Sequence, residues 1–247
     1  MLFTAQAVTH YHDSLVACTI VISMQFLKTT DNELGANSLY QRLAEHLEKG
    51  NKVLWLVSGG SNITVSVAIM QRLSPSLTTN LSILLADERF GPVGHPDSNA
   101  TQLLAAGFNH KQATILPVLL GVSTLDDSLR RYEGITRQAF TEADYVIGQF
   151  GIGSDGHIAG ILPGSPAVSS RDFVAAYHSN PYTRLTLTAR ALKRLSVAYV
   201  FAYGDDKRQA LEQLRDSTLS YDVQPSQILK ELPEAYVYND QLGGTEE

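Results

Sequence analysis

The chain of 247 residues contains a single cysteine, Cys18. An internal disulfide and a Cys-based zinc site are therefore excluded, and a reducing, cytoplasmic setting fits the composition. Long apolar stretches are lacking too, because the run 14–23 has only about ten residues, which is too short to span a bilayer. No positively charged segment precedes that run, as a signal peptide would require. We therefore expect a cytoplasmic protein with no membrane partner.

Positive charge is also in short supply. Lys and Arg number 19 against 25 Asp and Glu, which gives a net charge of −6 and argues against a nucleic-acid partner. A small anionic ligand is still compatible with this charge, because a local cluster of cations and backbone N–H groups can outweigh the mildly negative charge of the whole chain. With 44% hydrophobic and 18% charged residues, the chain has ample material for a core.

No linker or repeat divides the sequence. We expect one α/β domain over residues 24–240, in a monomer or small homo-oligomer, with residues 1–23 as an N-terminal extension and Met24 as an alternative start. Hydrophobic periodicity predicts helices over 31–49, 63–73, 100–106, 125–142, 189–195 and 204–214. Short apolar or alternating runs predict strands over 52–57, 81–86, 114–120, 144–150, 184–188, 196–203 and 235–238. This alternation indicates a doubly wound, mainly parallel sheet with helices on both faces, of the Rossmann-like type.

The glycine-rich loop Gly151–Gly164 follows one of these strands and carries the sharpest chemical signal. Three close glycines let its backbone adopt positive φ and approach a ligand. Within it, the His157 imidazole can take a proton from water, and the Asp155 carboxylate can orient the ring. A structural histidine is one alternative. A metal ligand is a weaker one, since no second His or Cys lies at ligand spacing.

Ser58–Ser61 lies between a predicted strand and a predicted helix. Its backbone N–H groups and the helix N-terminus can hold a phosphate without a positive side chain. The alternative is a tight turn in which Ser61 or Asn62 caps the helix. The segment matches neither of the common nucleotide-binding loops, so no nucleotide is implied.

Two further strand ends add charged groups. Arg89, in Asp87–Arg89, has the planar fork that suits phosphate and carboxylate oxygens, although a salt bridge on a solvated loop is the usual alternative. In His95–Asn99, Asp97 or Ser98 is expected to cap the next helix. Arg184, Thr186 and Lys207 form the last group, and a solvated side chain is the alternative for Lys207.

These segments, in this order, resemble the 6-phosphogluconolactonases, a family that shares its fold and ancestry with the glucosamine-6-phosphate deaminases. The matching blocks are Ser58–Ser61, Asp87–Arg89 with His95–Asn99, Gly151–His157 ending in Leu162–Gly164, Arg184–Thr188 and Gly204–Lys207. They cover most of residues 50–215, and five modest blocks in order are specific.

The resemblance implies a hydrolase of the pentose phosphate pathway that opens 6-phospho-D-glucono-1,5-lactone to 6-phosphogluconate, without metal or cofactor. It implies that His157 activates water and that Asp155 orients it. Arg89 would stabilise charge near the lactone, and Asp87 belongs to the same catalytic group. The residues implied for binding the phosphate of this sugar-phosphate substrate are Ser58, Gly59, Gly60, Ser61, Arg184 and Lys207.

The sequence also departs from the family pattern. Asn62-Ile63 replace the usual Thr-Pro, and Ile158–Leu162 replace the usual Thr-Ala-Ser-Leu-Phe. The deaminases typically carry a glutamate where this chain has Leu162, and leucine cannot transfer a proton, so deaminase chemistry is disfavoured. A glucosamine-6-phosphate deaminase or isomerase-like enzyme and a non-catalytic sugar-phosphate-binding protein remain the alternatives.

Overall fold

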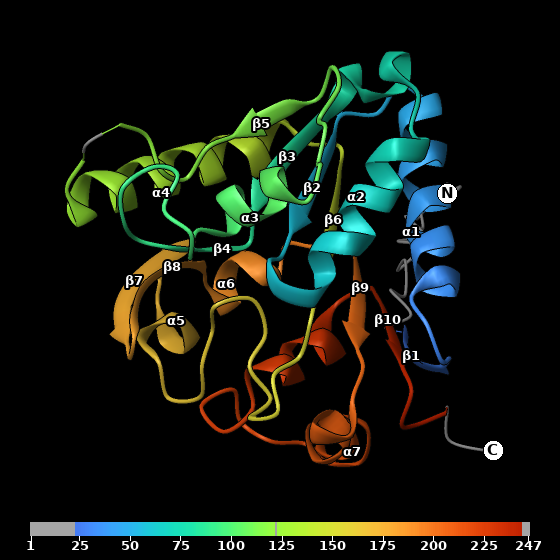
Figure 1. The fold of residues 1–247 in the computed structure, drawn as a ribbon. Helices are drawn as coiled ribbons and strands as arrows, with labels where there is room; N and C mark the ends of the chain where they lie inside the picture. Colours follow the sequence, from blue (N-terminus) through green and yellow to red (C-terminus); the bar gives the residue numbers. More distant parts are fainter. Residues whose placement is uncertain (1–22, 122, 244–247) are drawn as a thin grey trace, which may run out of the picture.

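A seven-stranded parallel sheet forms the centre of the computed structural model, which describes residues 23–121 and 123–243 (Figure 1). The strand order is β1-β10-β9-β6-β2-β3-β5, and every adjacent pair is parallel. The strands are β1 (Ser23–Lys28), β2 (Val53–Val57), β3 (Leu81–Leu85), β5 (Thr114–Leu116), β6 (Tyr145–Phe150), β9 (Val197–Ala202) and β10 (Glu234–Asn239). The predicted extension 1–23 lies outside the described residues except for Ser23.

The α-helices of the described residues are α1 (Glu33–Glu48), α2 (Ile63–Arg72), α3 (Asn99–Ala105), α4 (Leu125–Glu142), α5 (Pro166–Ser169), α6 (Ala189–Leu192) and α7 (Arg208–Asp216). Short 3-10 helices span Gly60–Asn62, Pro75–Asn80, Asp205–Lys207 and Pro225–Glu231. Every residue of β2 and β9 is buried, as expected for parallel strands covered on both faces. The predicted doubly wound fold is therefore confirmed. Among the described residues, no helix has the length and apolar character needed to cross a membrane.

Local signals account for most element boundaries. Helix α1 stops just before Gly50, which adopts a φ of +80° as a helix-terminating glycine does. Ser98 caps α3 as predicted, because its Oγ accepts the Thr101 N–H at 3.2 Å. The predicted strand 114–120 was too long, since β5 ends at Leu116. Pro117 follows, and proline has no N–H to donate to the ladder.

A second, antiparallel sheet lies beside the main one, with the order β4-β8-β7 (Figure 1). Its strands are β4 (Asp87–Arg89), β8 (Tyr182–Leu187) and β7 (Val174–Ser179), and the chain passes from β3 to β4 through Ala86 alone. The solvated-loop alternative for Asp87–Arg89 is wrong, because Asp87 and Glu88 are buried within β4. The predicted strand 184–188 exists, but it belongs to this second sheet.

The order of the parallel strands creates a switch point between β2 and β6. From β2 the chain moves outward through β3 to β5, and it then returns to place β6 on the other side of β2. The segments that follow β2 and β6 are Ser58–Ser61 and Gly151–Gly164. Open α/β sheets bind their ligands at such a point, outside the carboxyl ends of the strands.

Candidate active site

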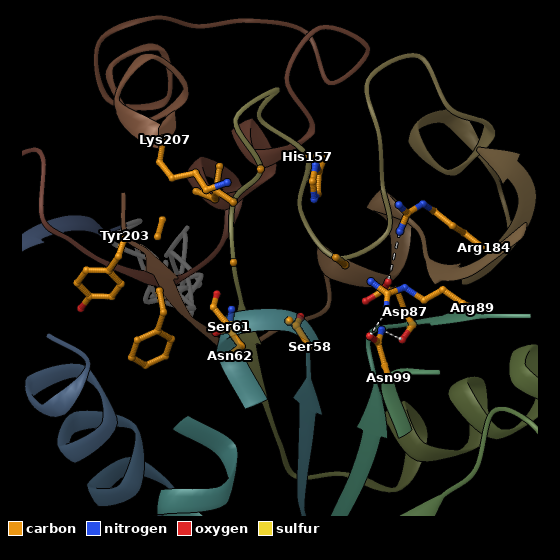
Figure 2. Close-up of a pocket in the computed structure, with 18 residues that line it drawn as sticks. Ser58, Ser61, Asn62, Asp87, Arg89, Asn99, His157, Arg184, Tyr203 and Lys207 are labelled. Atoms are coloured by element: carbon orange, nitrogen blue, oxygen red, sulfur yellow. Dashed lines mark hydrogen bonds and ion pairs between the residues drawn. The ribbon is translucent and has the colours of Figure 1, made fainter. Parts of the chain in front are cut away.

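A cleft of about 310 Å³ opens at this switch point. Ten residues were assigned to catalysis or phosphate binding from the sequence, and nine of them line the cleft: Ser58, Gly59, Gly60, Ser61, Asp87, Arg89, His157, Arg184 and Lys207. The tenth, Asp155, contacts His157. Figure 2 shows Lys207 on one side of the cleft and Arg184 on the other, with Ser58 and His157 between them.

The His157 ring is held by the carboxylate of Asp155. Oδ1 of Asp155 lies 2.6 Å from His157 Nδ1 and also accepts the His157 backbone N–H at 3.1 Å. The hydrogen bond to His157 holds the pKa of Asp155 at about 2, against a smaller opposing effect of burial. An ionised carboxylate only accepts hydrogen bonds, so Nδ1 carries the proton in the neutral ring. Nε2 is then the nitrogen with a free lone pair, as a general base requires.

Buried isoleucines make the loop around His157 a fixed element. Ile152, Ile158 and Ile161 are all buried, and β-bridges pair Ile152 with Ile158 and Ile158 with Ile161. Gly153 has to be glycine, because a Cβ there would lie 2.0 Å from Nδ1 of His157. The loop therefore presents the imidazole from a rigid frame, which is what a positioned catalytic group needs.

Hydrogen bonds at Gly160 hold the part of the same loop that follows His157. The Thr186 Oγ1 accepts the Gly160 N–H at 3.0 Å, and the Tyr177 hydroxyl donates to the Gly160 carbonyl. A Cβ on Gly160 would lie 2.8 Å from the Thr186 Cβ and 2.9 Å from that of Asp87. The departure from the family pattern at Gly160 therefore has a steric reason in this chain. Leu162, at the position of the deaminase glutamate, does not line the cleft.

Arg89 lines the cleft, and its guanidinium is held by Asn99, the first residue of α3. Its Nη1 donates to Asn99 Oδ1 at 2.6 Å and to the Asp97 carbonyl at 3.0 Å. Asn99 Nδ2 in turn donates to the Asp87 carbonyl, and a Cβ on Gly59 would collide with the Asn99 amide. Asn99 thus joins the second sheet to the Ser58–Ser61 loop. Its place in the His95–Asn99 block was a signal, but no local pattern indicates this role.

Glu88, the residue before Arg89, stabilises the fold. Its buried carboxylate accepts the Asn99 and Arg89 backbone N–H groups at 2.7 Å each. The Ser98 hydroxyl at 2.9 Å and the Ala100 N–H at 3.0 Å complete the set. A negative charge at the start of α3 is favourable there and fixes the direction in which β4 presents Arg89.

Asp87 and Arg184 lie close together on the neighbouring strands β4 and β8 of the second sheet. Arg184 Nη1 lies 3.9 Å from Asp87 Oδ2, and the β4–β8 register pairs Arg184 with Arg89. Burial raises the pKa of the Asp87 carboxyl, while Arg89, Arg184 and His157 oppose that rise. The Nε atoms of both arginines are buried and make no hydrogen bond to any described residue. Both guanidinium-bearing residues line the cleft.

The Ser58–Ser61 loop has the features of an anion-binding turn. Gly60 adopts a φ of +63°, and the loop leads through a 3-10 turn into α2. The buried Ser58 Oγ makes no hydrogen bond to any described residue. Asn62 stands at the N-cap position of α2, but its side chain does not cap the helix. Lys207, which also lines the cleft, forms an ion pair with Asp206, with its Nζ 2.9 Å from Asp206 Oδ2.

Comparison with known proteins shows the family to which the chain belongs. A family model described as glucosamine-6-phosphate isomerases/6-phosphogluconolactonase matches residues 32–238. The chain belongs to this family. The chain is similar to a 6-phosphogluconolactonase from Neisseria meningitidis, 26% identical over 194 residues, with 72% of this chain and 82% of that protein covered. One from Helicobacter pylori is 29% identical over 182 residues, with 67% and 78% covered.

Solved structures with the family's fold superpose well on the chain. A crystal structure of a 6-phosphogluconolactonase from Shewanella baltica gives a TM-score of 0.73 at 18% identity, covering 87% of this chain and 97% of that one. A Thermotoga maritima 6-phosphogluconolactonase also gives 0.73, at 19% identity with 87% and 98% covered. At this level of identity the likeness shows the fold.

Proposed function

We propose that this chain is a 6-phosphogluconolactonase, which hydrolyses 6-phospho-D-glucono-1,5-lactone to 6-phosphogluconate in the pentose phosphate pathway. The observation that carries the proposal is the His157 ring, held through Nδ1 by Asp155 and bordering a cleft lined with Arg89, Arg184 and Lys207. Membership of the family and the similarity to known 6-phosphogluconolactonases support the same activity. The cytoplasmic location and the small oligomeric state remain predictions from the sequence.

In this proposal His157 activates water. Nε2 removes a proton as the water oxygen attacks the lactone carbonyl carbon, and the carbonyl oxygen becomes an oxyanion. When that intermediate collapses, the bond to the ring oxygen breaks, and the ring oxygen receives the proton that His157 took up. The carboxylic acid formed then loses its own proton to water. Asp155 stabilises the imidazolium that exists between the two transfers.

Charge that develops on the lactone needs donors in place beforehand. Arg89 is held by Asn99 and the Asp97 carbonyl, so its guanidinium needs little reorganisation when the oxyanion forms. Asp87 lies next to Arg184 and, in this proposal, helps to keep the arginines in place as part of the catalytic group.

The phosphate end of the substrate is assigned to Ser58, Gly59, Gly60 and Ser61, with Lys207 and Arg184 on the two sides. Backbone N–H groups of a loop that leads into a helix suit phosphate oxygens, as does the Ser58 hydroxyl, which has no partner among the described residues. Binding this group away from the carbonyl would align the lactone with His157, so that binding energy is used for orientation.

The direct test follows the loss of freshly prepared 6-phosphogluconolactone with and without the protein, after subtraction of spontaneous hydrolysis. Acceleration by the wild-type chain is the expected result. Ammonia release from glucosamine 6-phosphate without lactone hydrolysis would favour the deaminase alternative. Binding of 6-phosphogluconate without any turnover would favour a sugar-phosphate-binding protein.

A further inference from the structure

Asn62 joins the two loops that border the cleft. In the orientation that satisfies both ends of its amide, the side chain donates to the Phe150 carbonyl and accepts the Gly151 N–H, each at 3.2 Å. Phe150 ends β6, and Gly151 begins the loop that carries His157. Figure 2 shows Asn62 next along the chain from Ser61, at the edge of the cleft. One side chain thus connects the end of the Ser58–Ser61 loop to the start of the His157 loop.

The main chain of Asn62 strengthens the same connection. Its carbonyl oxygen accepts Gln149 Nε2 at 2.9 Å, and Gln149 Oε1 accepts the Ser66 hydroxyl at 3.0 Å. Gln149 and Ser66 are fully buried. A buried polar network whose members are satisfied holds one arrangement, because breaking any bond leaves a polar group without a partner.

The switch point explains why this connection is needed. The β2–β6 ladder ends at the pair Leu56 and Gly148, so the last residues of β6 have no partners on β2. Phe150 stays paired with Val200 of β9, and on the side where β2 no longer pairs, Asn62 supplies a hydrogen-bond partner to the Phe150–Gly151 peptide group. Gly151 also allows the close approach, since a Cβ there would lie 2.9 Å from the Asn62 side-chain amide.

We propose that Asn62 is a positioning residue that fixes the His157 loop relative to the phosphate-binding loop. Its catalytic consequence rests on the proposed function, whereas its effect on the loop does not. Because a displacement of about 1 Å can cost a hundredfold in rate, removing the amide should reduce kcat by about 10- to 100-fold. The Ser58–Ser61 loop and Lys207 stay in place, so inhibition by inorganic phosphate should change by less than about threefold.

The test compares Asn62→Ala with Thr136→Val, a control at another fully buried polar position, on α4 and away from the cleft. Amide hydrogen exchange at Gly151, measured by NMR, should be faster in Asn62→Ala and unchanged in the control. The fall in kcat should appear with the phosphate inhibition constant retained. Unchanged exchange at Gly151, an unchanged kcat, or an equal loss of kcat and phosphate affinity would each overturn the proposal.

Asn62→Asp is the second variant, for use if Asn62→Ala does not fold. Its carboxylate still accepts the Gly151 N–H but cannot donate to the Phe150 carbonyl, so exchange at Gly151 should stay slow while kcat falls less than in Asn62→Ala. A wild-type kcat for Asn62→Asp would contradict the proposal. If the wild-type chain hydrolyses no lactone, the proposed function fails, and the exchange at Gly151 still decides whether Asn62 holds the loop.

Discussion

One carboxylate oxygen of Asp155 holds both the ring and the backbone of His157, at 2.6 Å from Nδ1 and 3.1 Å from the main-chain nitrogen. The acid therefore sets the tautomer of the imidazole as well as its direction. Asp155→Asn should lower kcat by about 100-fold with little change in KM, because the neutral amide no longer stabilises the imidazolium. Steady-state kinetics on fresh lactone measure this, and an unchanged kcat would contradict the orienting role.

The same contact predicts an acid dependence of stability. The folded-state pKa of Asp155 is about 2, below the ordinary value of about 4 that applies to the unfolded chain. The contact should thus stabilise the fold above pH 4 and lose this effect as pH falls towards 2. Denaturant unfolding should show Asp155→Asn less stable than wild type at pH 7, with the difference vanishing near pH 2. A difference independent of pH would contradict the assignment.

Gly160 provides a steric prediction. Gly160→Ala should destabilise the fold by about 1–3 kcal/mol, because the new methyl group meets the Cβ atoms of Thr186 and Asp87. The matched control is Gly134→Ala on α4, where a Cβ has open space and should stabilise the helix by about 0.5–1 kcal/mol. Thermal or denaturant unfolding gives both values, and effects of the same sign would refute the argument.

Removing the buried charge of Glu88 should be costly although Glu88 takes no part in the proposed reaction. Glu88→Gln turns one oxygen into an NH₂ group that faces hydrogen-bond donors, so at least one donor is left unsatisfied. We expect a loss of about 3 kcal/mol in the free energy of unfolding. Glu142→Gln, at an exposed position on α4, is the control and should be nearly neutral. Equal stability of Glu88→Gln and wild type would show that the carboxylate is not required.

Lys207 tests the phosphate end. Lys207→Ala should raise KM and the inhibition constant of inorganic phosphate by about 10- to 100-fold, as expected for the loss of a charge-assisted contact. Arg208→Ala removes the same charge from the next residue, which is exposed and does not line the cleft. It should leave both constants within about twofold of wild type, since exposed charges are screened. Equal effects of the two variants would indicate that only net charge matters.

The sequence predicted the main sheet well because its strands are continuous apolar runs. Such runs are typical of parallel strands buried on both faces, as in β2 and β9. It missed β7, whose middle and end contain half-buried and exposed residues, and it missed β1 at the edge of the sheet. Strand β4 was hidden because Asp87–Arg89 has only polar residues, and their burial depends on partners far along the chain.

The site was predicted as residue types at strand ends, and the cleft does bring those residues together. The supporting residues could not be found in this way. Asn62 looked like a helix cap but bonds to β6, and Asn99 acts through Arg89 and Gly59. Both roles depend on contacts between segments 10 to 90 residues apart, which local pattern does not encode.

Whether His157 activates water is decided by the rate of lactone hydrolysis by wild type and by His157→Ala, each corrected for the spontaneous reaction. This mechanism predicts clear acceleration by wild type and, for a folded His157→Ala variant, a rate lower by about 100-fold or more with phosphate inhibition unchanged. A folded His157→Ala variant that hydrolyses the lactone at the wild-type rate would contradict it.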